Sequence, residues 1–180
     1  MDAAKVLLLG DPALRDRSVE VEDFDNAAFR DGLATLASTL DAFRAQRGFG
    51  RAISAAQIGI AMRFIAVNLG QGTFFVVNPV VTWTSEETFT MWDDCMSFPD
   101  LLVRVTRADS MSLAYVDENG RAKTWERMGR AESELLQHEI DHLDGVLAVD
   151  RAMDRESLVL REVFEKNRGY YRSLVDYTIE

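Results

Sequence analysis

The chain contains two histidines, His138 and His142, and Glu139 directly follows the first. In an α-helix, side chains four residues apart project from the same face, so both imidazoles can bind one metal ion. Glu139 would then lie beside that ion. Residues 132–143 contain no glycine or proline, and Gly145 follows them as a typical helix stop. The sequence therefore predicts a metal-binding helix in this region.

A catalytic metal usually takes three protein ligands and keeps one position for water, so a third ligand must come from elsewhere. Cys95 would supply a thiolate, a strong ligand for a first-row divalent metal, although a free cysteine is also commonly a small buried hydrophobe. Glu162 would give the two-histidine, one-glutamate set of thermolysin-like peptidases. It lies in a charged run between Arg161 and Lys166, however, which is more typical of a solvated helix face. The pattern alone leaves both ligands open.

The size and charge of the chain limit its organisation and its partners. A length of 180 residues with 47% hydrophobic content is enough for one sizeable core, so we expect a single domain over residues 1–180. The net charge of -10 argues against a protein that binds phosphate backbones, and we expect no direct nucleic-acid partner. Cys95 is the only cysteine, which excludes an internal disulfide.

The chain has no long apolar segment, so we expect no membrane partner. Residues 1–9 are too short and too weakly basic to form an export signal. We therefore expect a cytoplasmic protein.

Two helices are predicted besides the metal-binding one. Residues 25–47 carry apolar side chains at the three-and-four spacing of one helix face, with Asp25 as N-cap and Gly48 as stop. A last helix is expected to begin with Asp154 as its cap and to bury an apolar stripe. That stripe consists of Leu158, Val159, Val163 and Phe164.

Strands are predicted between these helices, where β-branched and aromatic residues alternate with turn signals. The runs are residues 63–69, 73–77 and 80–90, followed by a hairpin of residues 110–116 and 122–128 around Asn119-Gly120. The order of elements favours an α+β fold with mostly antiparallel strands around the metal-binding helix.

Three segments together resemble peptide deformylases. The family patterns are G-x-G-L-A-A-x-Q, E-G-C-L-S and Q-H-E-x-D-H-L-x-G. Here residues 50–57 read G-R-A-I-S-A-A-Q, residues 93–97 read D-D-C-M-S, and residues 137–145 read Q-H-E-I-D-H-L-D-G. The third segment matches completely, and weaker similarity extends over nearly the whole chain. The resemblance implies a peptide deformylase-like fold and makes Cys95 the preferred third ligand.

The resemblance implies a metal-dependent hydrolase that removes the N-formyl group from the initiator methionine of newly made peptides and releases formate. Cys95, His138 and His142 would hold one divalent metal, usually ferrous iron in this family, with zinc, nickel or cobalt also able to occupy the site. Hydroxide from a metal-activated water would attack, and Glu139 would pass the proton to the leaving amine.

The resemblance also assigns the residues around the substrate, an N-formylmethionyl peptide. The Gln57 side-chain amide and the Met96 backbone N–H would stabilise negative charge on the formyl oxygen. Main chain at Gly50 and Ile53 would pair with the extended peptide, with Asp94 at the pocket mouth. An apolar pocket would take the methionine side chain. Apart from the resemblance, a local basic patch would still permit contact with a translating ribosome.

The departures from the family pattern that bear on the site are Ala52, Ser54, Asp93, Asp94 and Leu102. Asp93 is expected to pair with an arginine such as Arg107, and Asp141 either to orient a histidine or to face solvent. Asp94, which replaces glycine, would be strained at positive φ and would otherwise add negative charge to the pocket. Ala52, Asp94 and Leu102 keep open the same chemistry on a different formyl-amide or small amide. A separate alternative is a non-catalytic metal-binding relative, and the intact Glu139 and Gln57 count against it.

Overall fold

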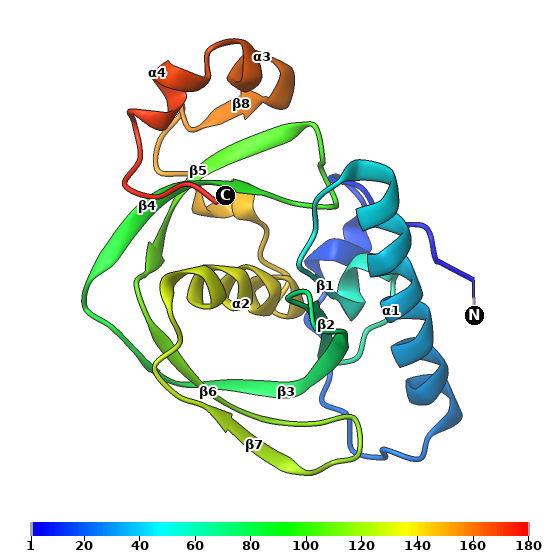
Figure 1. Cartoon of the computed structure of the whole chain (residues 1–180). Coiled ribbons are helices and arrows are strands. Elements are labelled where there is room, and N and C mark those ends of the chain that lie inside the picture. Colours follow the sequence, from blue (N-terminus) through cyan, green and yellow to red (C-terminus); the bar gives the residue numbers. More distant parts are fainter. Residues whose placement is uncertain (1, 180) are drawn as a thin grey trace.

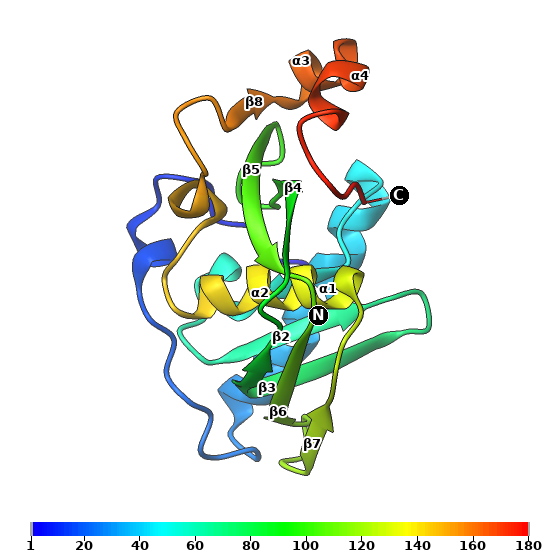
Figure 2. The same ribbon diagram turned by 90° about the vertical axis from the view of Figure 1, so that its left-hand side faces the viewer.

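The computed structural model describes residues 2–179 and contains two antiparallel sheets with one helix between them (Figure 1). The five-stranded sheet has the order β1-β2-β3-β6-β7, and the three-stranded sheet has the order β4-β5-β8. Figure 2 shows the helix α2 passing between the two sheets. The strands are β1 (Ala52–Ser54), β2 (Phe64–Asn68), β3 (Thr73–Thr84), β4 (Thr88–Asp94), β5 (Leu101–Ala108), β6 (Met111–Val116), β7 (Ala122–Trp125) and β8 (Leu158–Leu160).

The helices provide the rest of the scaffold. The α-helices are α1 (Ala27–Arg47), α2 (Arg130–Leu143), α3 (Arg161–Lys166) and α4 (Arg168–Arg172). Three short 3₁₀ helices are η1 (Pro12–Arg15), η2 (Ala55–Ile58) and η3 (Ala148–Arg151). The expected α+β class and the mostly antiparallel arrangement around α2 are confirmed.

The helix α2 is fixed by its apolar side. Leu136, Ile140 and Leu143 pack with Val67 and Met111 of the five-stranded sheet in one buried cluster. Burying such side chains stabilises the fold by about 1.5–3 kcal/mol each, so the rotation of α2 about its axis is strongly determined. Its opposite side is thereby directed toward the three-stranded sheet, and this is the side that carries the two histidines.

The first predicted helix is confirmed, with one correction at its start. Asn26, and not Asp25, is the N-cap, because the Asn26 side chain accepts hydrogen bonds from the backbone N–H groups of Ala28 and Phe29. Gly48 ends the helix in the left-handed conformation at φ 78°, as predicted.

Asn78-Pro79 does not interrupt the second strand as expected. The strand β3 continues through it, and its register with β6 shifts between Val77 and Val80. Asn78 adopts φ 49°, and its side chain both donates to and accepts from the backbone of Val21. The predicted run 80–90 is therefore the end of β3 and the start of β4.

The prediction of a last helix starting at Asp154 is wrong. Asp154 instead caps a turn, accepting from the Glu156 N–H and the Ser157 hydroxyl. Residues 158–160 form β8, which pairs with β5 so that Val159 lies opposite Leu102. Helix α3 begins only after that strand. The strands β1 and β5 were not predicted.

The hairpin around Asn119-Gly120 is confirmed, because β6 pairs with β7 in the antiparallel sense. Gly120 has φ 76°, which this turn requires and glycine adopts at little cost. The second strand is shorter than predicted and ends at Trp125. Within residues 2–179, no helix is both long and apolar enough to cross a membrane.

Candidate active site

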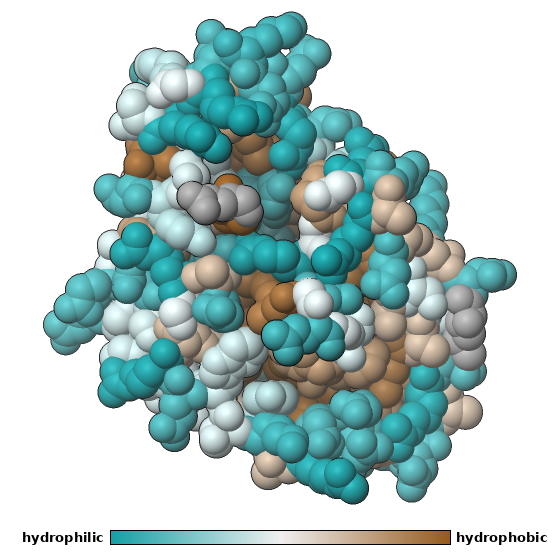
Figure 3. All heavy atoms as spheres, viewed as in Figure 1, coloured by the Kyte–Doolittle hydropathy of each residue, from teal (hydrophilic) through white to brown (hydrophobic). Residues whose placement is uncertain are grey.

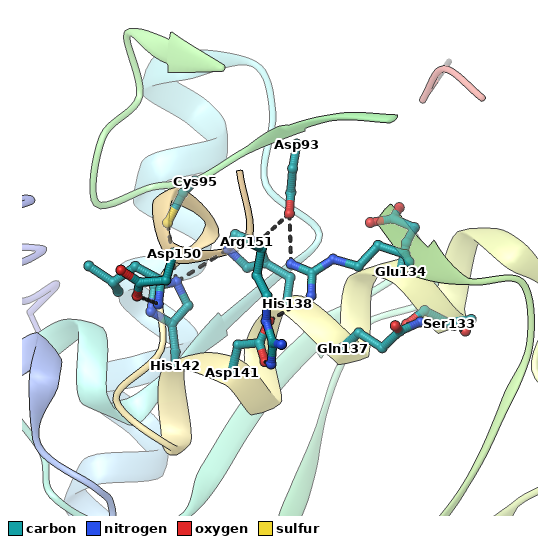
Figure 4. A network of polar contacts seen from close by, with 12 residues as sticks. Asp93, Cys95, Ser133, Glu134, Gln137, His138, Asp141, His142, Asp150 and Arg151 are labelled. Carbon is teal, nitrogen blue, oxygen red and sulfur yellow. Dashed lines mark hydrogen bonds and ion pairs between the residues drawn. The ribbon is translucent and has the colours of Figure 1, made fainter. Parts of the chain in front are cut away.

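Three metal-type ligands converge where the end of β4 faces α2 (Figure 4). Cys95 follows β4 directly, and its Sγ lies 3.2 Å from Nε2 of His142. The Nε2 atoms of His138 and His142 are also 3.2 Å apart. One ligand atom of each residue lies within 4.8 Å of the others, and all three side chains are buried. The two histidines, four residues apart on α2, thus lie next to the single cysteine, as expected.

The chemistry of this donor set fits a divalent transition metal. Two imidazole nitrogens and a thiolate form a compact, soft set of ligands, with space for a fourth ligand from the adjoining cavity. The surroundings also favour positive charge here. Burial would lower the pKa of His138, but Asp93 and Cys95 outweigh it and raise that pKa well above its usual value. A bound metal ion would supply the positive charge that Asp93 and Cys95 favour here.

Asp93 orients the first histidine. Its Oδ2 lies 3.0 Å from Nδ1 of His138, which leaves Nε2 directed at the metal position. The same oxygen accepts a hydrogen bond of 2.9 Å from Arg107, so the expected pairing of Asp93 with Arg107 is confirmed. Burial would raise the pKa of Asp93, but His138 and Arg107 hold it well below its usual value. Asp93 is therefore an anion behind the ligand.

Asp141 takes neither of its two expected roles, because it neither orients a histidine nor faces solvent. Its carboxylate accepts from Arg107 at 2.6 Å and from Arg151 at 2.7 Å, and it contacts neither imidazole. Asp141 therefore holds Arg107, which in turn holds Asp93. His142 has no such partner, because its buried Nδ1 finds no acceptor within residues 2–179.

Glu139 lies at the bottom of the cavity with Ser54 beside it. The Ser54 hydroxyl lies 2.7 Å from Oε2 of Glu139 and 2.8 Å from the Glu139 backbone carbonyl oxygen. Burial raises the pKa of Glu139, and the charge of His138 offsets this only in part. A carboxyl group in these surroundings can both take up and release a proton.

Gln57 and Met96 supply hydrogen-bond donors next to the ligands. The Gln57 side-chain oxygen accepts from the Ser54 N–H at 3.0 Å, which directs its NH₂ group toward Cys95 Sγ at 3.6 Å and the Ser97 hydroxyl at 3.2 Å. The Met96 N–H has no acceptor among residues 2–179. The Met96 N–H is therefore free to donate to a negative oxygen beside the metal position, and the Gln57 NH₂ group is directed at the same place.

The cavity beside the ligands has a volume of about 830 Å³. It lies between β1 and β4, which are both edge strands of their sheets. Figure 3 shows that hydrophilic residues cover much of the face seen in Figure 1. Gly50 lines the cavity at φ 113°, and a Cβ there would approach Met96 Cε to 2.5 Å. Glycine is therefore required at the entrance.

Asp94 has no positive φ, so its replacement of glycine causes no backbone strain. It is the last residue of β4 and pairs with Arg161 at 3.0 Å. The guanidinium of Arg161 also lies 4.6 Å from the ring centre of Phe49. The negative charge that Asp94 adds to the cavity mouth is thus partly balanced by a C-terminal arginine.

The open edge of β4 presents main-chain groups to the cavity. Thr90 N–H and C=O bond to the C-terminal tail rather than to β5. Because such groups alternate along a strand, Trp92 and Asp94 turn theirs to the same open edge. The Arg51 carbonyl oxygen accepts a hydrogen bond from the Asn68 N–H of β2. Because main-chain groups alternate along a strand, those of Ile53 also point toward β2.

The same alternation leaves Ala52 facing the cavity from the opposite side. Ile53 itself is fully buried in the core. Two open strand edges thus face one another across the cavity, with α2 as its floor.

Glu162 is exposed on α3 and does not belong to the ligand group, so the two-histidine, one-glutamate alternative is wrong. Sequence reasoning missed the contact between Ser54 and Glu139, and the ion pair of the half-buried Arg51 with the buried Glu134 in the cavity wall. The spacing of Glu134 to His138, one helical turn, could have indicated that both face the cavity.

Comparisons with known proteins agree with this geometry. A family model described as polypeptide deformylase matches residues 3–157. A peptide deformylase of Thermotoga neapolitana is 34% identical over 158 residues, which cover 88% of this chain and 92% of that protein. A peptide deformylase of Pelotomaculum thermopropionicum is 34% identical over 163 residues, covering 90% of this chain and 99% of that protein.

Solved structures show the same similarity. The crystal structure of peptide deformylase from Thermotoga maritima matches with a TM-score of 0.77 at 29% identity, covering 86% of this chain and 100% of that one. A peptide deformylase from Synechococcus elongatus in complex with actinonin matches with a TM-score of 0.78 at 28% identity, covering 92% and 86%.

Proposed function

Because this chain belongs to the polypeptide deformylase family, we propose that Cys95, His138 and His142 hold the divalent metal of a deformylase site, with Glu139 as its acid and base. The activity of the chain is the hydrolytic removal of the N-formyl group from newly made peptides. The observation that supports this ligand set is the convergence of three buried ligand atoms within 4.8 Å beside Glu139.

A divalent metal at this position would polarise both water and the formyl carbonyl, making hydrolysis feasible near neutral pH. Glu139 takes the proton of the attacking water and then delivers it to the amine nitrogen, so that the leaving group departs neutral. The Ser54 hydroxyl, 2.7 Å away, holds the Glu139 carboxylate in one orientation for both steps. Gln57 and the Met96 N–H donate to the formyl oxygen as its negative charge grows.

The substrate binds as an extra strand between the two open edges. Trp92 and Asp94 on β4 and Ala52, next to Ile53, offer main-chain groups to an extended peptide, and Gly50 leaves room for it. Main-chain pairing reads the backbone and tolerates varied sequences, which suits an enzyme that acts on many newly made chains.

The metal is proposed to be ferrous iron in the cell, with zinc, nickel or cobalt able to replace it. Softness of the ligands alone permits iron or zinc. An N-formylmethionyl peptide is the proposed substrate, met in the cytoplasm where translation supplies it. Contact with the ribosome stays a prediction, as does the absence of membrane and nucleic-acid partners.

Metal content after anaerobic purification tests the ligand set. Cys95→Ala should remove most of the bound metal, since a site with two histidines alone loses its thiolate ligand. Glu162→Ala is the matched control and should bind one equivalent, as the unchanged protein does. Full metal content in Cys95→Ala, or loss in Glu162→Ala, would overturn the proposed set. The metal recovered from cells grown without added zinc identifies the ion.

A further inference from the structure

Glu134 is a buried carboxylate in the cavity that the deformylase chemistry does not use. It is 2% exposed and lies one helical turn before His138 on α2. Arg51 forms an ion pair with one of its oxygens and also donates to the Ala131 carbonyl at 3.0 Å. A charged pair in the wall of this cavity differs from the apolar methionine pocket that the family resemblance implies.

The second oxygen of Glu134 is free to bind a ligand. Arg51 contacts Oε1, and no residue within 2–179 donates a hydrogen bond to Oε2. Burial raises the pKa of Glu134 to about 7, with Arg51 offsetting it in part, so the carboxyl group lacks solvation. Glu134 lines the cavity, and Oε2 is not one of the side-chain atoms closed off from it, so a donor on a bound substrate can reach this oxygen.

The direction of the bound peptide places its first side chain near Glu134. The strand β4 and helix α2 run side by side in the same direction, because Arg130 lies over the Phe89 ring at one end and His142 contacts Cys95 at the other. A peptide with its formyl group at the metal position must run back along β4, over the preceding turn of α2. Glu134 lies about 6 Å along the helix axis from His138, within reach of a first side chain directed at α2.

The C-terminal tail closes the far end of this groove. Asp176 and Tyr177 bond to Thr90, and Tyr177 lines the cavity together with Arg51 and Glu134. A side chain that leaves the peptide toward α2 therefore meets a wall with a phenol, a guanidinium and a carboxylate.

We propose that Glu134, held by Arg51, determines specificity for the first residue of the formylated peptide by accepting a hydrogen bond from a neutral donor on its side chain. A neutral donor suits the site because Arg51 already compensates the charge of Glu134. The whole cavity is lined by five arginines and five acidic residues. An amide such as glutamine satisfies the free oxygen, whereas the thioether of methionine does not. This inference rests on the proposed deformylase reaction and changes only the preferred first residue of its substrate, from methionine to a residue with a side-chain amide.

The test compares kcat/KM for formyl-Gln-Ala-Ser and formyl-Met-Ala-Ser in the metal-loaded protein. The glutamine peptide should be the better substrate, by about tenfold, because its side-chain amide donates a hydrogen bond to Glu134 Oε2. Removing Glu134 alone would leave Arg51 unpaired, so the variant is the double change Arg51→Leu with Glu134→Leu, which replaces the buried pair by apolar side chains. It should reverse the preference to methionine.

Glu132→Gln removes a carboxylate from the same helix without touching the ion pair, and it should keep the preference of the unchanged protein. A strong preference for methionine in the unchanged protein, with the same ratio in the double variant, would overturn the proposal.

A binding measurement separates this inference from the deformylase activity. Calorimetry with Gln-Ala-Ser and Met-Ala-Ser on the Glu139→Gln variant reports the first-residue preference without turnover. Tighter binding of the glutamine peptide that is lost in Arg51→Leu with Glu134→Leu supports the inference even if no formate is released. Equal binding of both peptides overturns it, whatever the activity.

Discussion

At the scale of single residues, the orientation of the ligand His138 depends on Asp93, which joins it to the buried Arg107. This carboxylate replaces the family's usual glutamate with a side chain one methylene shorter, yet it reaches both partners. Its charge holds the imidazole in the orientation that directs Nε2 at the metal.

Asp93→Asn should therefore weaken metal binding by about 10–100-fold, the range found when the partner of a ligating histidine is changed. Competition with a chromogenic chelator measures the affinity. Asp94→Asn is the control, because Asp94 contacts Arg161 and no ligand, and it should leave the affinity unchanged. An unaltered affinity in Asp93→Asn would contradict this role.

The residues that carry chemistry were predictable because their side-chain type and spacing reveal it. The chain has two histidines and one cysteine, so imidazole and thiolate ligands can come only from His138, His142 and Cys95. Ser54 was not recognised as a partner of Glu139, since 85 residues separate them and no local pattern links a serine at the end of β1 to a helix. Asp141 was misassigned for the same reason, because its arginine partners come from β5 and η3.

At the scale of elements, the local pattern failed where tertiary pairing decides the conformation. Residues 158–160 fit an amphipathic helix by spacing, but β5 offers them an unpaired edge and they form β8. The strand β5 itself was missed, and its inward face contains Arg107, a charge that only Asp93 and Asp141 make tolerable in the interior. Long periodic segments such as α1 and α2 were predicted correctly.

The C-terminal tail is an element that depends on one side chain. Asp176 accepts from the Thr90 N–H at 3.0 Å and from the Thr90 hydroxyl at 2.8 Å. Asp176→Ala should release the tail from β4, so hydrogen exchange at the Thr90 amide should accelerate while amides in α2 keep their protection. Asp154→Ala, which alters a turn elsewhere, should leave the Thr90 amide protected. Unchanged exchange at Thr90 in Asp176→Ala would show that Tyr177 alone holds the tail.

At the scale of the whole molecule, the metal position connects the two sheets. Cys95 belongs to the end of the three-stranded sheet, whereas His138 and His142 are on the helix that packs on the five-stranded sheet. Binding of an ion by all three residues should therefore stabilise the complete fold.

Metal at a thousand times its dissociation constant should add about 4 kcal/mol to the free energy of unfolding, which raises Tm by roughly ten degrees for a chain of this size. Scanning calorimetry of the metal-free and ferrous forms measures the shift, and zinc should act likewise. We expect one transition in each scan, as a single domain over residues 1–180 requires. Two transitions, with only one of them moved by metal, would contradict this expectation.

Formate release measures the proposed hydrolysis itself. The anaerobic, iron-loaded protein is given short formylated peptides beginning with methionine or glutamine, beside the Glu139→Gln variant at equal metal content. We expect steady release of formate from the unchanged protein. The rate should fall by about a hundredfold or more in the variant, because glutamine cannot carry the proton while the three metal ligands stay in place. Equal rates in both proteins, or no release from either peptide, would contradict the role assigned to Glu139 beside Cys95, His138 and His142.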